Sequence, residues 1–142
     1  ALEIEFGIDF DDAAIGAQRR RFLLDRSAFK SELSRARTFG RLQDVERMRA
    51  AGFGRGGSLD NAVVVDGAEV LNPGGLRFVD EFVRHKILDS VGDLALAGAP
   101  IMGRYDAGKR GLRRPDARYQ GRRAAGVIGP VTAPSCRRIS SV

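Results

Sequence analysis

His85 and Asp89 are the pair of residues best suited to chemistry, because His85 is the only histidine in the chain and an acid lies four residues after it. On a helix, residues i and i+4 share one face, so an imidazole nitrogen and a carboxylate oxygen can converge on one point. Zinc takes nitrogen and oxygen ligands at about 2.0–2.2 Å, and a catalytic zinc usually has three protein ligands. The pair is therefore a candidate half of a zinc site. An ordinary His–Asp pair on a solvated helix face is the alternative, since the spacing shows no third ligand.

The helix that carries this pair is predicted from Asp80 to Asp93. Its start is favoured by Asp80 and Glu81, whose charges complement the helix dipole. One stripe of the helix is apolar and must face a core; it consists of Val83, Ile87, Val91 and Leu94. The opposite side is polar and consists of His85, Lys86, Asp89 and Asp93. Four polar groups therefore share the face on which chemistry is expected.

The rest of the chain alternates strand and helix patterns and predicts an α+β fold. Residues 2–10 alternate apolar and polar types, which is the pattern of a strand with one buried face. The other predicted elements are a strand at 19–24, a helix that Ser27 caps and that ends near Arg37, a helix at 44–51 that ends at Gly52, a hairpin of strands 61–66 and 68–71 around Asp66-Gly67, and a strand at 100–105.

Positive charge is concentrated in the last quarter of the chain. The formal net charge is +6 over 142 residues, but residues 1–103 hold 14 Lys and Arg against 16 Asp and Glu, whereas residues 104–142 hold 10 against 2. Such a tail can bind RNA or a membrane surface, and a protein acting through residues 104–142 is the alternative function. Tyr105 and Tyr119 are its only aromatic residues that could stack on bases, so no nucleic-acid partner is expected.

Composition excludes several other classes of protein. The single Cys136 rules out an internal disulfide framework and a cysteine-based zinc cluster. No secretory signal and no apolar run long enough to cross a bilayer is present, which predicts a cytoplasmic protein without a transmembrane segment. The chain opens at Ala1, without methionine and inside a predicted strand, so we expect it to be a piece of a longer polypeptide.

Several separated motifs resemble the UDP-3-O-acyl-N-acetylglucosamine deacetylases, the zinc amidases of lipid A synthesis in Gram-negative bacteria. The strongest is the stretch from Leu71 to Asp93, and further motifs lie upstream in the same order at 57–62, 37–40 and 8–10. The resemblance covers about residues 1–109. It implies a two-layer sandwich of a β-sheet packed against helices at residues 1–107, similar to the second domain of the deacetylase, with a small inserted subdomain at about 38–65.

The resemblance also implies roles for individual residues. His85 and Asp89 would be zinc ligands, the third being a histidine in a first domain that this chain lacks, beside a glutamate that acts as general base. Thr38 would stabilise the oxyanion, and Phe39 and Lys86 would contact the UDP-linked acylated glucosamine substrate. The insert would form a passage for the acyl chain, although ordinary packing also explains its apolar residues, which are Phe39, Leu42, Val45 and Met48.

Agreement with the family ends near Lys109. Asp93 matches an aspartate that orients a second catalytic histidine, but Leu112 stands where that histidine is expected. Asp93 could equally be a solvent-facing or cap-like carboxylate without a role in catalysis. Residues 108–142 have no helical period, and we predict a basic, disordered tail that arises from a change of reading frame. The isolated chain, a fragment or variant of the deacetylase, is expected to be inactive.

Overall fold

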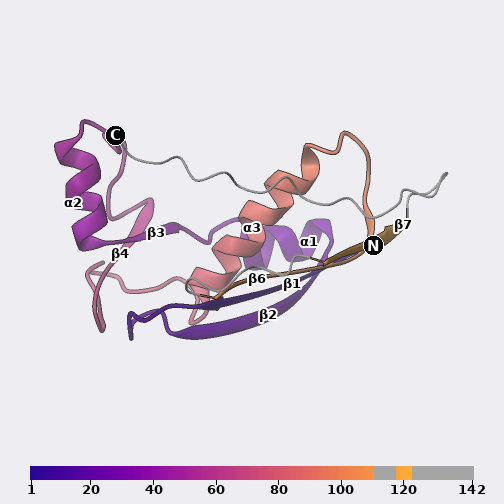
Figure 1. The fold of residues 1–142 in the computed structure, drawn as a ribbon, viewed down its shortest axis with the longest axis horizontal. Coiled ribbons are helices and arrows are strands. Elements are labelled where there is room, and N and C mark those ends of the chain that lie inside the picture. Colours follow the sequence, from indigo (N-terminus) through magenta and orange to yellow (C-terminus); the bar gives the residue numbers. More distant parts are fainter. Residues whose placement is uncertain (111–117, 123–142) are drawn as a thin grey trace.

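The computed structural model describes residues 1–110 and 118–122, which form two β-sheets and their helices (Figure 1). The elements follow in the order β1 (Leu2–Asp9), β2 (Ala17–Leu24), α1 (Arg26–Ala28), the π-helix η1 (Phe29–Leu33), β3 (Thr38–Arg41), α2 (Leu42–Ala50), β4 (Ala62–Asp66), β5 (Glu69–Val70), α3 (Glu81–Ala95), β6 (Met102–Arg110) and β7 (Arg118–Arg122).

The larger sheet has the strand order β2-β1-β6-β7, in which β1 is antiparallel to β2 and parallel to β6. The alternation predicted for β1 is confirmed, because Leu2, Ile4 and Ile8 are buried on one face. On the other face Glu5 forms ion pairs with Arg19 of β2 and with Arg104 of β6. The sheet therefore has one apolar face and one charged face, so its core lies on one side only.

Helices cover the apolar face of this sheet (Figure 1). Ile87 of α3 and Leu33 of η1 are fully buried against it. They belong to a cluster of buried side chains made of Leu2, Ile4, Phe22, Leu33 and Ile87. The sheet and these helices form two layers, as the sequence predicts for an α+β fold.

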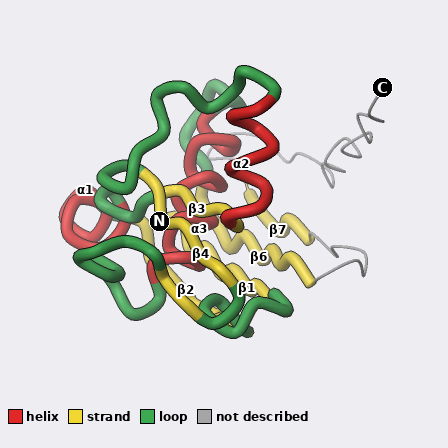
Figure 2. Tube along the Cα trace, turned by 90° about the vertical axis from the view of Figure 1, so that its left-hand side faces the viewer, coloured by secondary structure: helices red, strands yellow, loops and turns green. Residues whose placement is uncertain are grey.

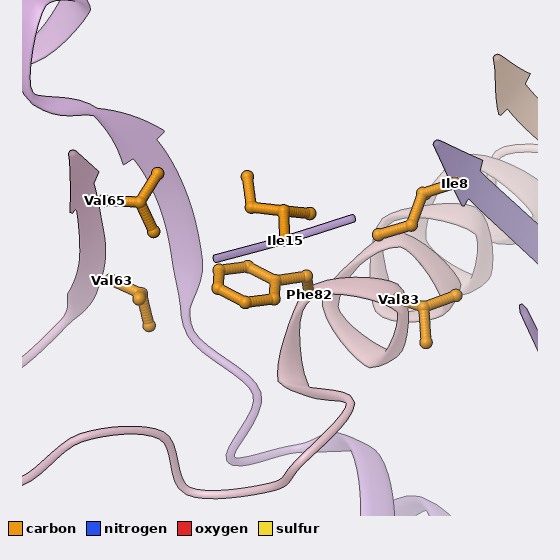
Figure 3. Close-up of a cluster of buried hydrophobic side chains, with 6 residues drawn as sticks. All are labelled: Ile8, Ile15, Val63, Val65, Phe82 and Val83. Atoms are coloured by element: carbon orange, nitrogen blue, oxygen red, sulfur yellow. The ribbon is translucent and has the colours of Figure 1, made fainter. Parts of the chain in front are cut away.

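The smaller sheet, with the order β3-β4-β5, lies with α2 at one end of the molecule (Figures 1 and 2). β3 and β4 are parallel and α2 connects them, so residues 38–66 form a compact β-α-β unit. A second buried cluster joins this unit to α3 and β1; it consists of Ile8, Ile15, Val63, Val65, Phe82 and Val83 (Figure 3). Phe82 therefore couples the small sheet to the first turn of α3.

Several local details differ from the sequence prediction. The helix expected to end near Arg37 ends at Leu33 as the π-helix η1, and β3 was not predicted. The helix after β2 is capped by Asp25, not Ser27, since the carboxylate of Asp25 accepts from the amide of Ala28 at 2.9 Å. The hairpin turn consists of Gly67 and Ala68, one residue later than expected. Gly67 adopts a φ of 57°, a left-handed conformation that favours glycine. At the helix start a neighbouring residue provides the cap, and in the hairpin Gly67 is the first residue of the turn rather than the second.

The C-terminal boundaries also differ from the sequence prediction. β6 continues to Arg110 rather than ending at Tyr105, because residues 103–110 pair in parallel with β1. Residues 118–122 pair with β6 as β7. The rest of the predicted basic tail, residues 111–117 and 123–142, lies outside the described residues. Within the described residues, no helix is long and apolar enough to cross a membrane.

The central position of Phe82 predicts a large effect of its truncation. Phe82 is fully buried, whereas Phe53 is 68% exposed. We expect Phe82→Ala to lower the free energy of unfolding by about 3–5 kcal/mol, since the lost contacts and the cavity both contribute. Phe53→Ala is the matched control and should change it by less than about 0.5 kcal/mol. Urea unfolding measures both, and equal effects would contradict this account of the core.

Candidate metal centre

His85 lies on α3 with both ring nitrogens beside oxygen atoms. Val83 and Ile87 on the same helix are fully buried, which holds α3 against the sheet and leaves the His85 side chain 15% exposed. Nδ1 of His85 is 3.2 Å from the backbone oxygen of Ala36. Because a carbonyl oxygen can only accept, Nδ1 carries the hydrogen in this contact. In the neutral ring the lone pair is then on Nε2.

Nε2 of His85 is 3.3 Å from Oδ1 of Asp89. The second carboxylate oxygen, Oδ2, accepts a hydrogen bond of 2.7 Å from Nζ of Lys86. Asp89 is 44% exposed at its side chain, so both contacts lie at the surface of the helix. The i, i+4 spacing therefore brings His85 and Asp89 together as predicted, with one oxygen of Asp89 directed at the imidazole.

The donor set fits half of a zinc site. Two ligands at about 2.0–2.2 Å from a tetrahedral zinc are about 3.3–3.6 Å apart, and the observed separation of Nε2 and Oδ1 is 3.3 Å. The remaining atoms, Nδ1 and Oδ2, are each held by a hydrogen bond, which is the usual environment of zinc ligands. Among residues 1–110 and 118–122, no group of three or more His, Cys, Asp or Glu side chains could hold a metal.

Phe39 of β3 forms the wall beside this pair. Its ring makes edge contacts with Phe10 and Phe82, with centroid separations of 5.7 and 5.0 Å. It also stands 6.3 Å from the ring of His85, and Nζ of Lys86 lies 5.6 Å from its centroid. These distances allow a cation–π contact with Lys86 and an edge contact with His85. The structure thus brings together four of the predicted site residues.

Within the described part of the chain, no hydrogen bond or ion pair joins the two other predicted site residues, Thr38 and Asp93, to the side chains of this group. Thr38 is exposed at the start of β3, next to Phe39. Asp93 is exposed one turn beyond Asp89, and its charge acts on Tyr105. The pKa of Tyr105 is raised above its usual value by burial and, to a smaller extent, by Asp93. Leu112 lies outside the described residues.

The apolar residues predicted to line a passage are only partly buried. Leu42 and Val45 of α2 are half-buried, and Met48 is 47% exposed. Helix α2 has no fully buried residue. Phe39, by contrast, packs against the second core cluster. The role of Phe39 in packing is therefore established, whereas a passage for an acyl chain stays a prediction.

Glu81 is the principal feature of the site region that sequence reasoning missed. Its carboxylate is fully buried and accepts from the backbone amide of Arg37 at 2.9 Å, from Nε and Nη2 of Arg37 at 2.9 and 3.0 Å, and from the amide of Arg77 at 2.7 Å. Burial would raise the pKa of Glu81, but the hydrogen bonds from Arg37 and Arg77 lower it below its usual value. In the sequence, the spacing of Glu81 and His85 indicates only that the two residues share one face of the helix, and no local pattern pairs Glu81 with Arg37.

The arginines of this network also tie down the segments that enter the site. Arg37 donates to the carbonyl of Gly75 at 2.8 Å, and Arg77 donates to the carbonyls of Arg35 and Asp60 at 3.0 Å each. The chain before β3, the loop before β4 and the loop before α3 therefore meet around one buried charge pair.

A second charged cluster fixes the start of α3. Asp80 pairs with Arg20 of β2 and with Arg84, and Glu32 of η1 pairs with the same two arginines. Burial would raise the pKa of Asp80, but hydrogen bonds from Arg84 and Arg20 lower it. The sequence prediction assigned Asp80 to the helix dipole alone. Its hydrogen bonds to Arg20 and Arg84 show that it also links β2 to α3, and Glu32 adds η1 to the cluster through the same arginines.

Comparison with known proteins gives a consistent family assignment. The family model described as UDP-3-O-acyl N-acetylglycosamine deacetylase matches residues 1–114. A UDP-3-O-acyl-N-acetylglucosamine deacetylase from Phenylobacterium zucineum is 54% identical over 106 residues, which are 75% of this chain and 36% of that protein. The proteins of the same name from Nitratiruptor sp. and Anaeromyxobacter sp. are 52% and 53% identical, over 75% and 76% of the chain. The chain spans about a third (36%) of the length of these relatives.

The buried Glu81 pair predicts a pH dependence of stability. Because the pKa of Glu81 is lowered on folding, its ionised form stabilises the fold above the unfolded pKa of about 4.3, and this contribution is lost as pH falls through the folded pKa. At pH 7 we expect Glu81→Gln to lower the free energy of unfolding by about 3–5 kcal/mol, since Arg37 is left buried and unpaired.

The difference between wild type and Glu81→Gln should shrink as the pH is lowered below about 4.3. Urea unfolding at a series of pH values measures this difference. Glu46→Gln, which changes an exposed carboxylate of α2, is the control and should have little effect at any pH. A difference between wild type and Glu81→Gln that stays constant down to pH 3 would be inconsistent with an ionised Glu81.

Proposed function

Because the chain belongs to the family of UDP-3-O-acyl N-acetylglycosamine deacetylases, we propose that it forms one part of a zinc-dependent hydrolase. The reaction is removal of the N-acetyl group from UDP-3-O-(3-hydroxyacyl)-N-acetylglucosamine in lipid A biosynthesis, and its place is the cytoplasm. The proposal rests chiefly on one observation, the 3.3 Å separation of His85 Nε2 and Asp89 Oδ1 with their other atoms already hydrogen-bonded.

His85 and Asp89 are the residues that would hold the zinc. His85 would bind through Nε2 while Nδ1 stays on the carbonyl of Ala36. Asp89 would bind through Oδ1 while Lys86 retains Oδ2, which makes Asp89 a ligand with one oxygen. When bound, zinc supplies the Lewis acidity that makes an amide carbonyl open to attack by water. A third ligand and a general base would come from a first domain of the kind that the family resemblance implies.

Thr38, Phe39 and Lys86 would act on the substrate. Thr38 is exposed and lies in the chain between Arg37 and Phe39, and the ring of Phe39 makes an edge contact with His85. A hydroxyl held beside the reacting carbonyl can donate to the oxyanion that develops during attack. Phe39 is fixed by core packing, and the cation of Lys86 lies over its ring, so both can present a preformed surface to a negatively charged substrate.

Departure of the amine is the step for which this chain is least equipped. Asp93 is the carboxylate that would orient an acid-assisting histidine, and Leu112 occupies the expected position of that histidine in the sequence. A positioned general acid contributes roughly 10²–10⁴ in rate. Low turnover is therefore part of the proposal. The alternative function through residues 104–142 rests largely on residues that the structure does not describe.

The proposal predicts that zinc binds weakly to this chain and tightly to its assembly with a first domain. Two protein ligands give less affinity than three, because each adds a deprotonated donor to the site. Calorimetric titration should give a dissociation constant above about 1 µM for the chain alone. Mixing with the first domain of the Phenylobacterium zucineum relative should lower it by at least about 100-fold.

His85→Ala and Asp89→Ala should each abolish the gain on mixing. Asp93→Asn, on the same helix but without a contact to either ligand, is the matched control and should retain it. Release of acetate from the UDP-linked substrate by the mixture, followed in parallel, tests the reaction itself. Tight zinc binding by the chain alone that His85→Ala removes would contradict the proposed division of ligands.

A further inference from the structure

One peptide group connects Glu81 to His85. The peptide between Ala36 and Arg37 donates through the amide of Arg37 to Oε1 of Glu81 at 2.9 Å. The carbonyl of the same peptide, that of Ala36, lies 3.2 Å from Nδ1 of His85. Glu81 and His85 are four residues apart on α3 and therefore share one face of the helix. A single backbone unit thus bridges two side chains that are one helical turn apart.

The orientation of this peptide is fixed by the buried carboxylate. Glu81 is fully buried and receives four hydrogen bonds, three from Arg37 and one from the amide of Arg77, so it has little freedom to move. A peptide group is planar, with its N–H and C=O on opposite sides. Once the N–H is directed at Glu81, the carbonyl must point the other way, toward His85.

The bridge has a chemical consequence for the imidazole. The negative charge on Glu81 polarises the amide that donates to it and makes the carbonyl at the other end a better acceptor. That carbonyl can only accept a hydrogen bond, so it favours the neutral ring with its hydrogen on Nδ1. The carboxylate of Asp89, 3.3 Å from Nε2, acts in the opposite direction when no cation is present, because a carboxylate oxygen can only accept and repels a bare nitrogen. The position of the ring hydrogen therefore depends on both acids.

We propose that Glu81 is a positioning residue for His85, which acts through the 36–37 peptide to select the ring form that leaves Nε2 free for a cation. The identity of that cation as zinc rests on the proposed function, whereas the selection of the ring form does not. Glu81 touches neither Nε2 nor Asp89 directly. Its role is to set the direction and the protonation of a ligand one turn away.

The single histidine makes this proposal directly testable in the full chain. In protein labelled with ¹⁵N-histidine, long-range proton–nitrogen spectra report which ring nitrogen carries the hydrogen, and every signal belongs to His85. Asp89→Asn removes the carboxylate that opposes this ring form, and at a pH at which the ring is neutral this variant should show Nδ1 protonated and Nε2 bare. Adding Glu81→Gln keeps the shape but removes the charge of Glu81, and it should shift the ring measurably toward the form protonated on Nε2.

Asp80→Asn is the matched control. Asp80 is the neighbouring carboxylate at the start of α3, but it pairs with Arg20 and Arg84 rather than with the 36–37 peptide. Its loss should leave the ring form of His85 unchanged. If Glu81→Gln does not fold, the double variant Arg37→Met/Glu81→Met removes both buried charges without leaving either one unpaired.

The outcomes separate this inference from the proposed function. An Asp89→Asn ring protonated on Nε2, or an unchanged ring form when the Glu81 carboxylate is also removed from this folded variant, would overturn the inference. A changed ring form together with about 10-fold weaker zinc binding in the two-domain mixture would support it. A ring form that responds to Glu81→Gln, together with no zinc binding by the wild type in that mixture, would refute the proposed function and leave the inference in place.

Discussion

The buried ion pair between Glu81 and Arg37 is the interaction on which the site region depends. A carboxylate without exposed surface would be neutral or disruptive unless its charge were matched, and here four hydrogen bonds from Arg37 and Arg77 match it. Both arginines also bind backbone carbonyls of the loops before β4 and α3. The pair therefore joins the small sheet to the helix that carries His85. The contact of Phe39 with the His85 ring depends on this connection together with the packing of Phe39 against Phe82.

The site combines a rigid inner part with an accessible outer part. Phe82, Val83 and Ile87 anchor α3 in both hydrophobic clusters, and the fully buried Glu81 lies in its first turn. One turn further, His85 is only 15% exposed, while Asp89 is 44% exposed. Side-chain burial thus decreases along one face of the helix, from Glu81 through His85 to Asp89. This gradient suits a metal ligand pair that must be held precisely by one domain and completed by groups from another.

Much of the fold followed from local patterns, and the long-range contacts did not. Alternation along β1, the apolar stripe of α3 and the i, i+4 spacing of His85 and Asp89 are properties of neighbouring residues, so the sequence alone predicted them. Glu81 accepts hydrogen bonds from Arg37, which is 44 residues away and which only the fold brings close to it. The amide of Arg77, four residues away, completes the set. At the start of α1, Asp25 and Ser27 are both good caps, and the pattern could not choose between them.

X-ray absorption at the zinc edge, on this chain mixed with the first domain of the Phenylobacterium zucineum relative, tests the central claim most directly. Three protein ligands are predicted, two imidazoles and one carboxylate, with one imidazole and the carboxylate supplied by His85 and Asp89. His85→Ala should remove one imidazole from the spectrum, and Asp89→Ala should remove the carboxylate. A zinc environment that neither substitution changes would show that this helix is not part of the metal centre.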